Sequence, residues 1–308
     1  MGERVWQLRA MGVPEILDET FRLYRRHFRK LFTIALAVRL PVAVCVSALS
    51  FLEIPNFDSP GLLLLMGIVG GLLYLAVHGL LVAALTGAIS GGYLGRQISA
   101  KGAYRQALSH LPPLLGIFLA TTPASILALV LGYGSVSIVM ALLGGLLVTF
   151  SPFLGHYYYW GWPSTLIEFL FLVLGSFPYL WLNSRLALAV PAVVLEPAPP
   201  RAALARSWRL TGGSRLRAFG AYAALAFLSL FFIALPTFVL LIALIGFDAA
   251  DGLVQAVMII VPALLSALIT PIRAGGLALL YYDLRIRREG LDLALQASAL
   301  GREGARPL

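Results

Sequence analysis

Six long apolar runs alternate with polar connections along the chain. A helix that spans a bilayer needs about 20 apolar residues, and every run is long enough. The pattern therefore predicts an all-α polytopic transmembrane helical bundle of about six spans. Residues 1–30 and 283–308 would flank a membrane domain over 31–282. The runs cover residues 31–52, 62–94, 112–150, 165–195, 216–247 and 253–280.

Composition supports this class. Hydrophobic residues make up 60% of the 308 and charged residues only 12%, against about 25% charged in soluble domains. A water-soluble globule is therefore excluded. We attribute the net charge of +9 to anionic lipid and membrane orientation rather than to nucleic acid. Cys45 is the only cysteine, so no intrachain disulfide can form.

The positions of Lys and Arg predict the orientation. Apart from three Arg inside apolar runs, they fall in both terminal segments and in the connections 96–105 and 201–217, whereas 53–61, 132–164 and 247–252 contain none. Short connections rich in Lys and Arg stay in the cytoplasm. We therefore expect cytoplasmic termini and three hairpins of two spans each.

Two runs exceed one crossing. Residues 62–94 would form a helix of about 50 Å, against about 30 Å of hydrocarbon, so we expect one long projecting helix. For residues 136–150 we expect a kinked continuation of the third run or a re-entrant segment on the outer side. The aromatic connection 156–162 is typical of an interfacial belt, with an aromatic ligand cage as the alternative.

A short pattern recurs before the first, third and fifth runs: a small or hydroxyl residue, an aromatic residue, then Arg. This placement suggests a threefold repeat of one basic helix that leads into a span. The three copies are Thr20-Phe21-Arg22, Ala103-Tyr104-Arg105 and Ser207-Trp208-Arg209.

The first copy predicts an amphipathic helix in the headgroup plane that binds anionic lipid. A solvated helix packed on other connections is the alternative. The turn at 211–214 begins a helix whose backbone N–H groups could hold a phosphate, with a plain turn as the alternative. The apolar face contains Leu17, Phe21, Tyr24, Phe28 and Leu31, and the anionic-lipid candidates are Arg22, Arg25, Arg26, Arg29, Lys30, Arg215 and Arg217.

Four charged residues interrupt apolar runs: Arg39, Glu168, Arg185 and Arg273. Arg39 would lie about 12 Å inside a span that begins at Leu31. Charges inside a membrane usually face the bundle interior or a watery cavity. We interpret these residues as a polar cavity for an anionic headgroup or solute, with snorkelling of the Arg side chains as the alternative.

Small residues recur at every fourth position over 79–95, at Gly79, Ala83, Gly87, Gly91 and Gly95. This spacing allows helix backbones to approach closely. The partner could be another helix of this chain, a second copy in a homo-oligomer, or another membrane protein.

Several segments resemble a bacterial family of polytopic proteins similar to the membrane domain attached to some glycerophosphoryl diester phosphodiesterases. The resemblance covers about residues 12–293, and Pro14 stands where the family usually has Gly. It implies a stand-alone protein of the bacterial cytoplasmic membrane, of undefined role. The segments are 15–28 (EILDETFRLYRRHF), 190–196 (VPAVVLE), 205–211 (ARSWRLT) and 281–290 (YYDLRIRREG).

The sequence lacks the motifs of the common enzymes. The His-Arg-Gly start that the resemblance implies for the phosphodiesterase is absent, as are G-x-S-x-G, H-E-x-x-H and Walker A patterns. We interpret the four His as structural and expect no metal and no cofactor. The leading hypothesis is a non-enzymatic membrane protein that binds anionic lipid at its cytoplasmic face, in lipid handling, scaffolding or regulation. The alternative is a transporter or permease subunit with a path lined by Arg39, Arg185 and Arg273.

Overall fold

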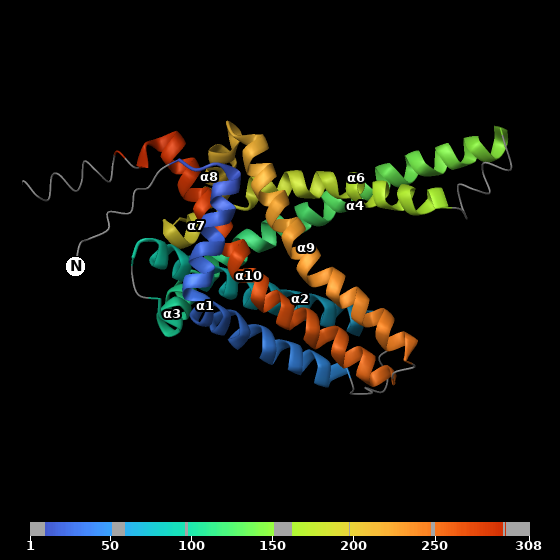
Figure 1. The fold of residues 1–308 in the computed structure, drawn as a ribbon, viewed down its shortest axis with the longest axis horizontal. Coiled ribbons are helices and arrows are strands. Elements are labelled where there is room, and N and C mark those ends of the chain that lie inside the picture. The colour runs from blue at the N-terminus through green and yellow to red at the C-terminus, as the bar shows by residue number, and fades with distance from the viewer. Residues whose placement is uncertain are drawn as a thin grey trace, which may run out of the picture.

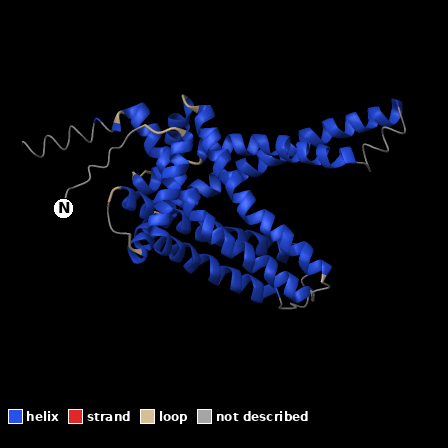
Figure 2. Cartoon of the chain, viewed as in Figure 1, coloured by secondary structure: helices blue, strands red, loops and turns tan. Residues whose placement is uncertain are grey.

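The protein is built from helices. The computed structural model describes residues 10–50, 59–95, 98–150, 162–196, 198–247, 250–291 and 293. Among these residues there is no strand (Figure 2). Six helices are long and apolar enough to cross a membrane. The predicted fold class, an all-α bundle with about six spans, is confirmed, and the chain has the structure of a multi-pass membrane protein.

Long helices account for most of the chain, and short helices lie between them. The long helices are α1 (Val13–Ser50), α2 (Pro60–Tyr93), α4 (Leu111–Phe150), α6 (Trp162–Leu186), α9 (Arg215–Gly246) and α10 (Asp251–Glu289). The short helices are α3 (Ala100–Ser109), α7 (Ala189–Leu195) and α8 (Pro200–Gly212).

The two runs that exceed one crossing are each a single helix. Helix α2 has 34 residues, as the apolar run predicts. Helix α4 has 40 residues, so 136–150 continues the third run and is not a separate re-entrant segment. Of the aromatic connection, residues 156–161 lie outside the described residues, and α6 begins at Trp162.

The long helices form two arms that diverge from a common end (Figure 1). One arm is the pair α4 and α6. The other contains α1, α2, α9 and α10. The three expected hairpins, α1 with α2, α4 with α6, and α9 with α10, are each packed neighbours, and α1 also packs extensively on α10.

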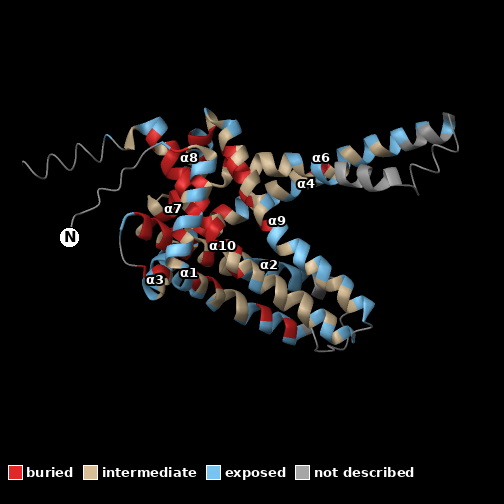
Figure 3. Ribbon diagram, in the orientation of Figure 1, coloured by how far each residue is buried: buried red, intermediate tan, exposed pale blue. Residues whose placement is uncertain are grey.

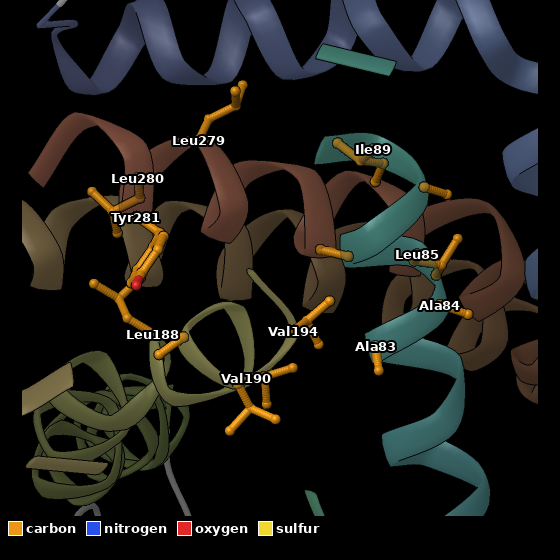
Figure 4. Packing of buried hydrophobic residues seen from close by; sticks show 14 of the residues in the cluster. Ala83, Ala84, Leu85, Ile89, Leu188, Val190, Val194, Leu279, Leu280 and Tyr281 are labelled. Atoms are coloured by element: carbon orange, nitrogen blue, oxygen red, sulfur yellow. The ribbon is translucent and has the colours of Figure 1, made fainter. Parts of the chain in front are cut away.

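We call the common end the basic end. It contains the first half of α1, the short helices α3, α7 and α8, and the last turns of α10. Buried residues concentrate there (Figure 3). Leu188 lies beside Tyr281 of α10, and Val194, together with Ala83 and Ala84 of α2, belongs to the same core (Figure 4). The ends of the arms expose Leu, Ile, Val and Phe side chains, as a helix surrounded by lipid does.

Both expected domain boundaries fall inside helices. Helix α1 continues from Val13 through Leu31 to Ser50, with a departure from helical geometry at His27 (φ −119°, ψ 21°). Helix α10 continues through Asp283, which is fully buried. Asp283 accepts hydrogen bonds from the Met11 backbone N–H at 2.8 Å and from Arg287 Nε at 2.9 Å. The described parts of the two terminal segments, residues 10–30 and 283–291, thus pack on the bundle.

Candidate functional site

A large cavity lies where the two arms meet. Its volume is ≈ 780 Å³, within the range of about 300–1,000 Å³ that is common for small-molecule sites. All six long helices contribute side chains to its wall. Residues far apart in the sequence therefore share one interior space, which we call the central cavity.

Arg39 of α1 is directed into this cavity. Its Nη2 lies 3.2 Å from Nδ1 of His78 on α2. Because a guanidinium can only donate, a hydrogen bond here requires Nδ1 to accept, so His78 is neutral and carries its proton on Nε2. The Nε of Arg39 is buried and has no hydrogen-bond partner among the described residues. Arg39 is therefore directed inward rather than snorkelling along its helix.

Rings of two neighbouring side chains hold His78 in this position. The Tyr74 ring stacks on it with centroids 5.7 Å apart, and the Phe118 ring contacts it edge-on at 5.9 Å. Tyr74 is one turn before His78 on α2, and Phe118 comes from α4. The imidazole orientation, and with it the Arg39 contact, is thus fixed by both arms.

Arg273 of α10 lines the same cavity and lies close enough to His78 to act on it electrostatically. The described residues that line the cavity include no Asp or Glu. Within the described part of the chain, no ion pair involves Arg39 or Arg273. The cavity therefore holds two positive charges without a carboxylate partner among the described side chains.

Several neutral polar groups of the wall are already hydrogen bonded within the protein. Thr86 and Thr270 donate to carbonyls one turn earlier in their own helices, at 2.8 and 2.6 Å. Ser125 of α4 donates to Asn183 Oδ1 of α6 at 3.1 Å. These three hydroxyl groups are therefore engaged within the protein rather than with the two guanidinium groups.

The remaining wall is apolar and reaches the outer surface of the bundle. Ile117, Leu129 and Ile233 belong to this part of the wall. Two other lining residues, Tyr74 and Ile126, are each 55% exposed. An amphiphile fits such a space, because a charged group and an apolar group would each meet matching surface.

The other two intramembrane candidates are not brought to this cavity among the described side chains. Glu168 is on α6, and its side chain lies outside the described residues. Arg185 is buried at the end of α6, where its Nη2 donates to the Trp208 carbonyl at 3.2 Å and its guanidinium lies 4.3 Å from the Trp208 ring centroid. Ser207 also donates to the Arg185 carbonyl at 2.6 Å. Arg185 therefore joins α6 to α8.

The basic face of α1 lies on the surface of the basic end. All five candidate residues there are exposed: Arg22, Arg25, Arg26, Arg29 and Lys30. The side of α1 that packs on the protein contains Ile16, Thr20 and Leu23. This packed side is rotated around the helix axis relative to the predicted apolar face. The reason is that α10 approaches α1 on the side of Thr20, where Thr20 lies against Gly275.

This rotation leaves part of the predicted apolar face uncovered. Phe21 and Phe28 are 37% and 40% exposed, Leu17 and Tyr24 are half-buried, and Leu31 is buried. Phe28 stacks on Phe32 with centroids 5.5 Å apart. Exposed aromatic rings and exposed cations thus share one surface of α1.

The two later copies of the repeat have a similar arrangement. The small residue is buried in each copy, at Thr20, Ala103 and Ser207. The Arg is exposed in each, and Trp208 is 48% exposed. Tyr104 is half-buried and donates to the Ile34 carbonyl, and burial raises the pKa of its hydroxyl to about 12. Helices α3 and α8 each lead into a long helix, as the repeat predicts.

Arg215 and Arg217 follow the turn between α8 and α9. Arg215 is exposed, and its Nε donates to the Gly212 carbonyl at 3.1 Å. Arg217 is engaged inside the protein: it donates to the Met11 carbonyl at 2.7 Å and lies 3.5 Å from Asp283 Oδ2. Of the two, only Arg215 is presented on the surface.

Much of the small-residue stripe of α2 packs within the chain. A Cβ at Gly79 would lie 2.8 Å from the Phe118 ring, and one at Gly87 would lie 3.2 Å from Gln106 Oε1. Gly87 also lines a second cavity of ≈ 460 Å³ at the basic end, which includes Arg285. Arg285 is paired with Glu196 and Glu289 at 2.7 and 3.1 Å, so this cavity does not combine uncompensated charges.

Sequence reasoning named Arg39 and Arg273 but missed His78, which it treated as structural. His78 lies 39 residues from Arg39, and no local motif links them.

Among the described residues, no three His, Cys, Asp or Glu side chains are grouped as metal ligands. Comparisons with protein-family models, characterised proteins and solved structures found no match. The resemblance over residues 12–293 stays a prediction.

Proposed function

We propose that this protein is a non-enzymatic integral membrane protein that binds anionic lipid at its cytoplasmic face and acts in lipid handling, scaffolding or regulation. In this proposal the basic end faces the cytoplasm of a bacterial membrane, because Lys and Arg accumulate on the side that is not translocated. The observation that carries the proposal is the exposed basic and aromatic face of α1.

A membrane interface suits both parts of this surface. Each Lys or Arg near an anionic leaflet contributes about 1 kcal/mol. The exposed rings of Phe21 and Phe28 would enter the boundary between headgroups and acyl chains, as the apolar side of an interfacial helix does. Helix α1 continues directly into its apolar half, which would hold this face at headgroup level.

The repeated units extend the proposed surface around the basic end. Trp208 and Arg209 of α8 are both exposed, and Arg105 is exposed on α3. Aromatic and basic side chains are both enriched where helices leave a bilayer. We therefore assign α1, α3 and α8 the same role, with α1 carrying the largest number of charges.

Substitution of four α1 cations tests the proposal. Changing Arg22, Arg25, Arg26 and Arg29 to Gln should weaken contact between α1 and anionic headgroups by up to about 4 kcal/mol, at about 1 kcal/mol per charge. A fluorophore near Tyr24 in nanodiscs would report headgroup contact, compared between anionic and zwitterionic lipid. The wild-type contact should also weaken as salt shortens the Debye length from about 10 to 3 Å.

Asp18→Asn is the matched control, because Asp18 is exposed on the same helix and its loss makes α1 more basic. It should leave contact with anionic lipid unchanged or strengthen it. Equal headgroup contact for the wild type and the quadruple variant, at low salt with anionic lipid present, would refute the electrostatic proposal.

Transport of an anionic solute is the second candidate function. It is favoured by the position of Arg39 and Arg273 in one cavity to which all six long helices contribute. The three-Arg path would also need Arg185, which instead contacts Trp208 of α8. Uptake of a labelled anion into proteoliposomes, lost on Arg273→Gln, would favour this candidate over lipid binding.

A further inference from the structure

We propose that the central cavity binds the phosphate group of an anionic lipid, with Arg39 and Arg273 as the two cationic contacts. This inference deepens the proposed lipid binding and rests on it. It assigns a specific site inside the bundle, separate from the basic surface of α1, and it names the chemical class that this site recognises.

Charge is the first argument. Two guanidinium groups line a cavity whose described wall includes no carboxylate. A buried charge is strongly disfavoured unless it is paired and hydrogen bonded. Charges within membrane helices are usually paired and often mark ligand pathways. An anion between α1 and α10 supplies the missing compensation for both Arg residues.

Hydrogen-bond donors are the second argument. A guanidinium has five N–H donors, and Arg39 uses one of them on His78. Its buried Nε has no partner within the described part of the chain. Guanidinium groups bind phosphate through paired N–H donors, and a phosphate has enough acceptor oxygens for two of them. Neutral His78 positions Arg39 without adding charge.

The shape of the wall distinguishes a lipid from a free anion. Apolar residues such as Leu129 and Ile233 line the cavity together with the charged side. The exposed lining residues Tyr74 and Ile126 connect it to the surface that faces lipid. A phosphate with attached acyl chains uses both parts of the wall, whereas inorganic phosphate uses only one.

Depth is consistent with a headgroup drawn in from the basic end. Arg273 precedes the buried Asp283 on α10 by ten residues, or about 15 Å of helix. This is about half of a hydrocarbon core of about 30 Å. The phosphate would thus lie well inside the bundle, beyond the reach of ordinary headgroup contacts.

The test measures lipid binding by the full-length protein in mild detergent. The probes are dioctanoyl phosphatidic acid, dioctanoyl phosphatidylcholine and inorganic phosphate, and the readouts are the lipid-induced shift of the melting temperature and the lipid retained in native mass spectrometry. Phosphatidic acid should raise the melting temperature of the wild type. Arg39→Gln and Arg273→Gln should each weaken its binding about 10- to 100-fold, the loss of one charge-assisted contact.

Arg288→Gln is the matched control, since it removes the same charge from an exposed position at the end of α10, outside the surface assigned to α1, α3 and α8; its affinity for phosphatidic acid should equal that of the wild type. Arg273→Lys keeps the charge without the planar fork and should retain intermediate affinity. Without lipid, Arg273→Gln should melt no lower than the wild type, because it removes a charge that has no carboxylate partner in the described part of the chain. A clearly lower melting temperature would contradict the inference.

Unchanged phosphatidic acid binding in both Gln variants would overturn the site. An equal Arg-dependent shift with inorganic phosphate would overturn the assignment to lipid, and an equal shift with phosphatidylcholine would overturn the preference for an anionic lipid. Failure of the proposed function has a separate signature, namely unchanged headgroup contact in the α1 quadruple variant. The two results can therefore be told apart.

Discussion

Gly132 of α4 should tolerate no side chain, because the backbone of α6 lies directly against it. A Cβ built at Gly132 would lie 2.1 Å from the backbone oxygen of Gly175 on α6, whereas real Cβ atoms essentially never approach within 3.0 Å. The obstacle is backbone, so rotation of a side chain cannot relieve it. Gly132→Ala must therefore push α4 and α6 apart by roughly 1 Å in a close-packed interface.

This displacement should cost about 1–3 kcal/mol, the usual effect of overpacking, because small residues allow membrane helices to approach. Gly134→Ala is the matched control on the same helix, since a Cβ there meets nothing within 4 Å. It should leave stability unchanged or raise it by about 0.5–1 kcal/mol through the lower backbone entropy of Ala.

Thermal unfolding in detergent, followed by tryptophan fluorescence, would measure the difference, and unfolding in graded SDS would check it. We expect Gly132→Ala to melt several degrees below both the wild type and Gly134→Ala. Gly175→Ala should have a smaller effect, because its Cβ would meet the Tyr133 ring at 2.3 Å and a side chain can move. If Gly132→Ala and Gly134→Ala melt at the same temperature, the close approach of α4 and α6 is refuted.

Three further predictions concern the basic end. Asp283→Asn should lower the free energy of unfolding by about 1–3 kcal/mol, because the fully buried carboxylate accepts hydrogen bonds from Met11 and Arg287. Glu19→Gln, which removes an exposed pair with Arg22, should change it by no more than about 0.5 kcal/mol. Equal melting temperatures of the two variants would contradict this prediction. Arg206→Lys should lower the melting temperature, because Arg206 forms ion pairs with Glu196 and Glu289. Arg209 is exposed on the same helix, and Arg209→Lys should leave the melting temperature unchanged. If both variants or neither lowered it, a stabilising role for the Arg206 ion pairs would be contradicted. In a Cys45→Ser background, a cysteine at Ala250 should react with an impermeant reagent from outside intact cells and one at Ser99 should not, and external labelling at Ser99 would reverse the predicted orientation.

The helical periodicity of α1 predicted its existence and basic surface but not the side that packs on the protein. Leu17, Phe21, Tyr24, Phe28 and Leu31 share a face by spacing, yet Phe21 and Phe28 are exposed while Ile16 is buried. Hydrophobic spacing alone could not distinguish a face that meets lipid from a face that meets another helix, because both are apolar. The approach of α10 on the side of Thr20 selected between them.

The candidate site was predictable only in part for the same reason. Arg39 and Arg273 interrupt apolar runs, so the cost of a charge in lipid identified both from the sequence. Arg185 gave the same signal, yet it lies against Trp208 of α8, outside the cavity. His78 gave no signal, because one His in an apolar run is compatible with a structural role. Only the crossing of α1, α2 and α10 decides which polar residues meet.

The sequence by itself determined the fold class and the number of candidate spans. Each apolar run satisfies its own backbone hydrogen bonds as a helix, which is the requirement that a bilayer imposes, so these features need no knowledge of neighbours. The tertiary structure decided the divergence of the α4 and α6 arm, the contact of Gly132 with Gly175 and the convergence of Arg39, His78 and Arg273. These depend on how each helix is rotated and where it crosses another, and packing between residues far apart in the chain fixes both.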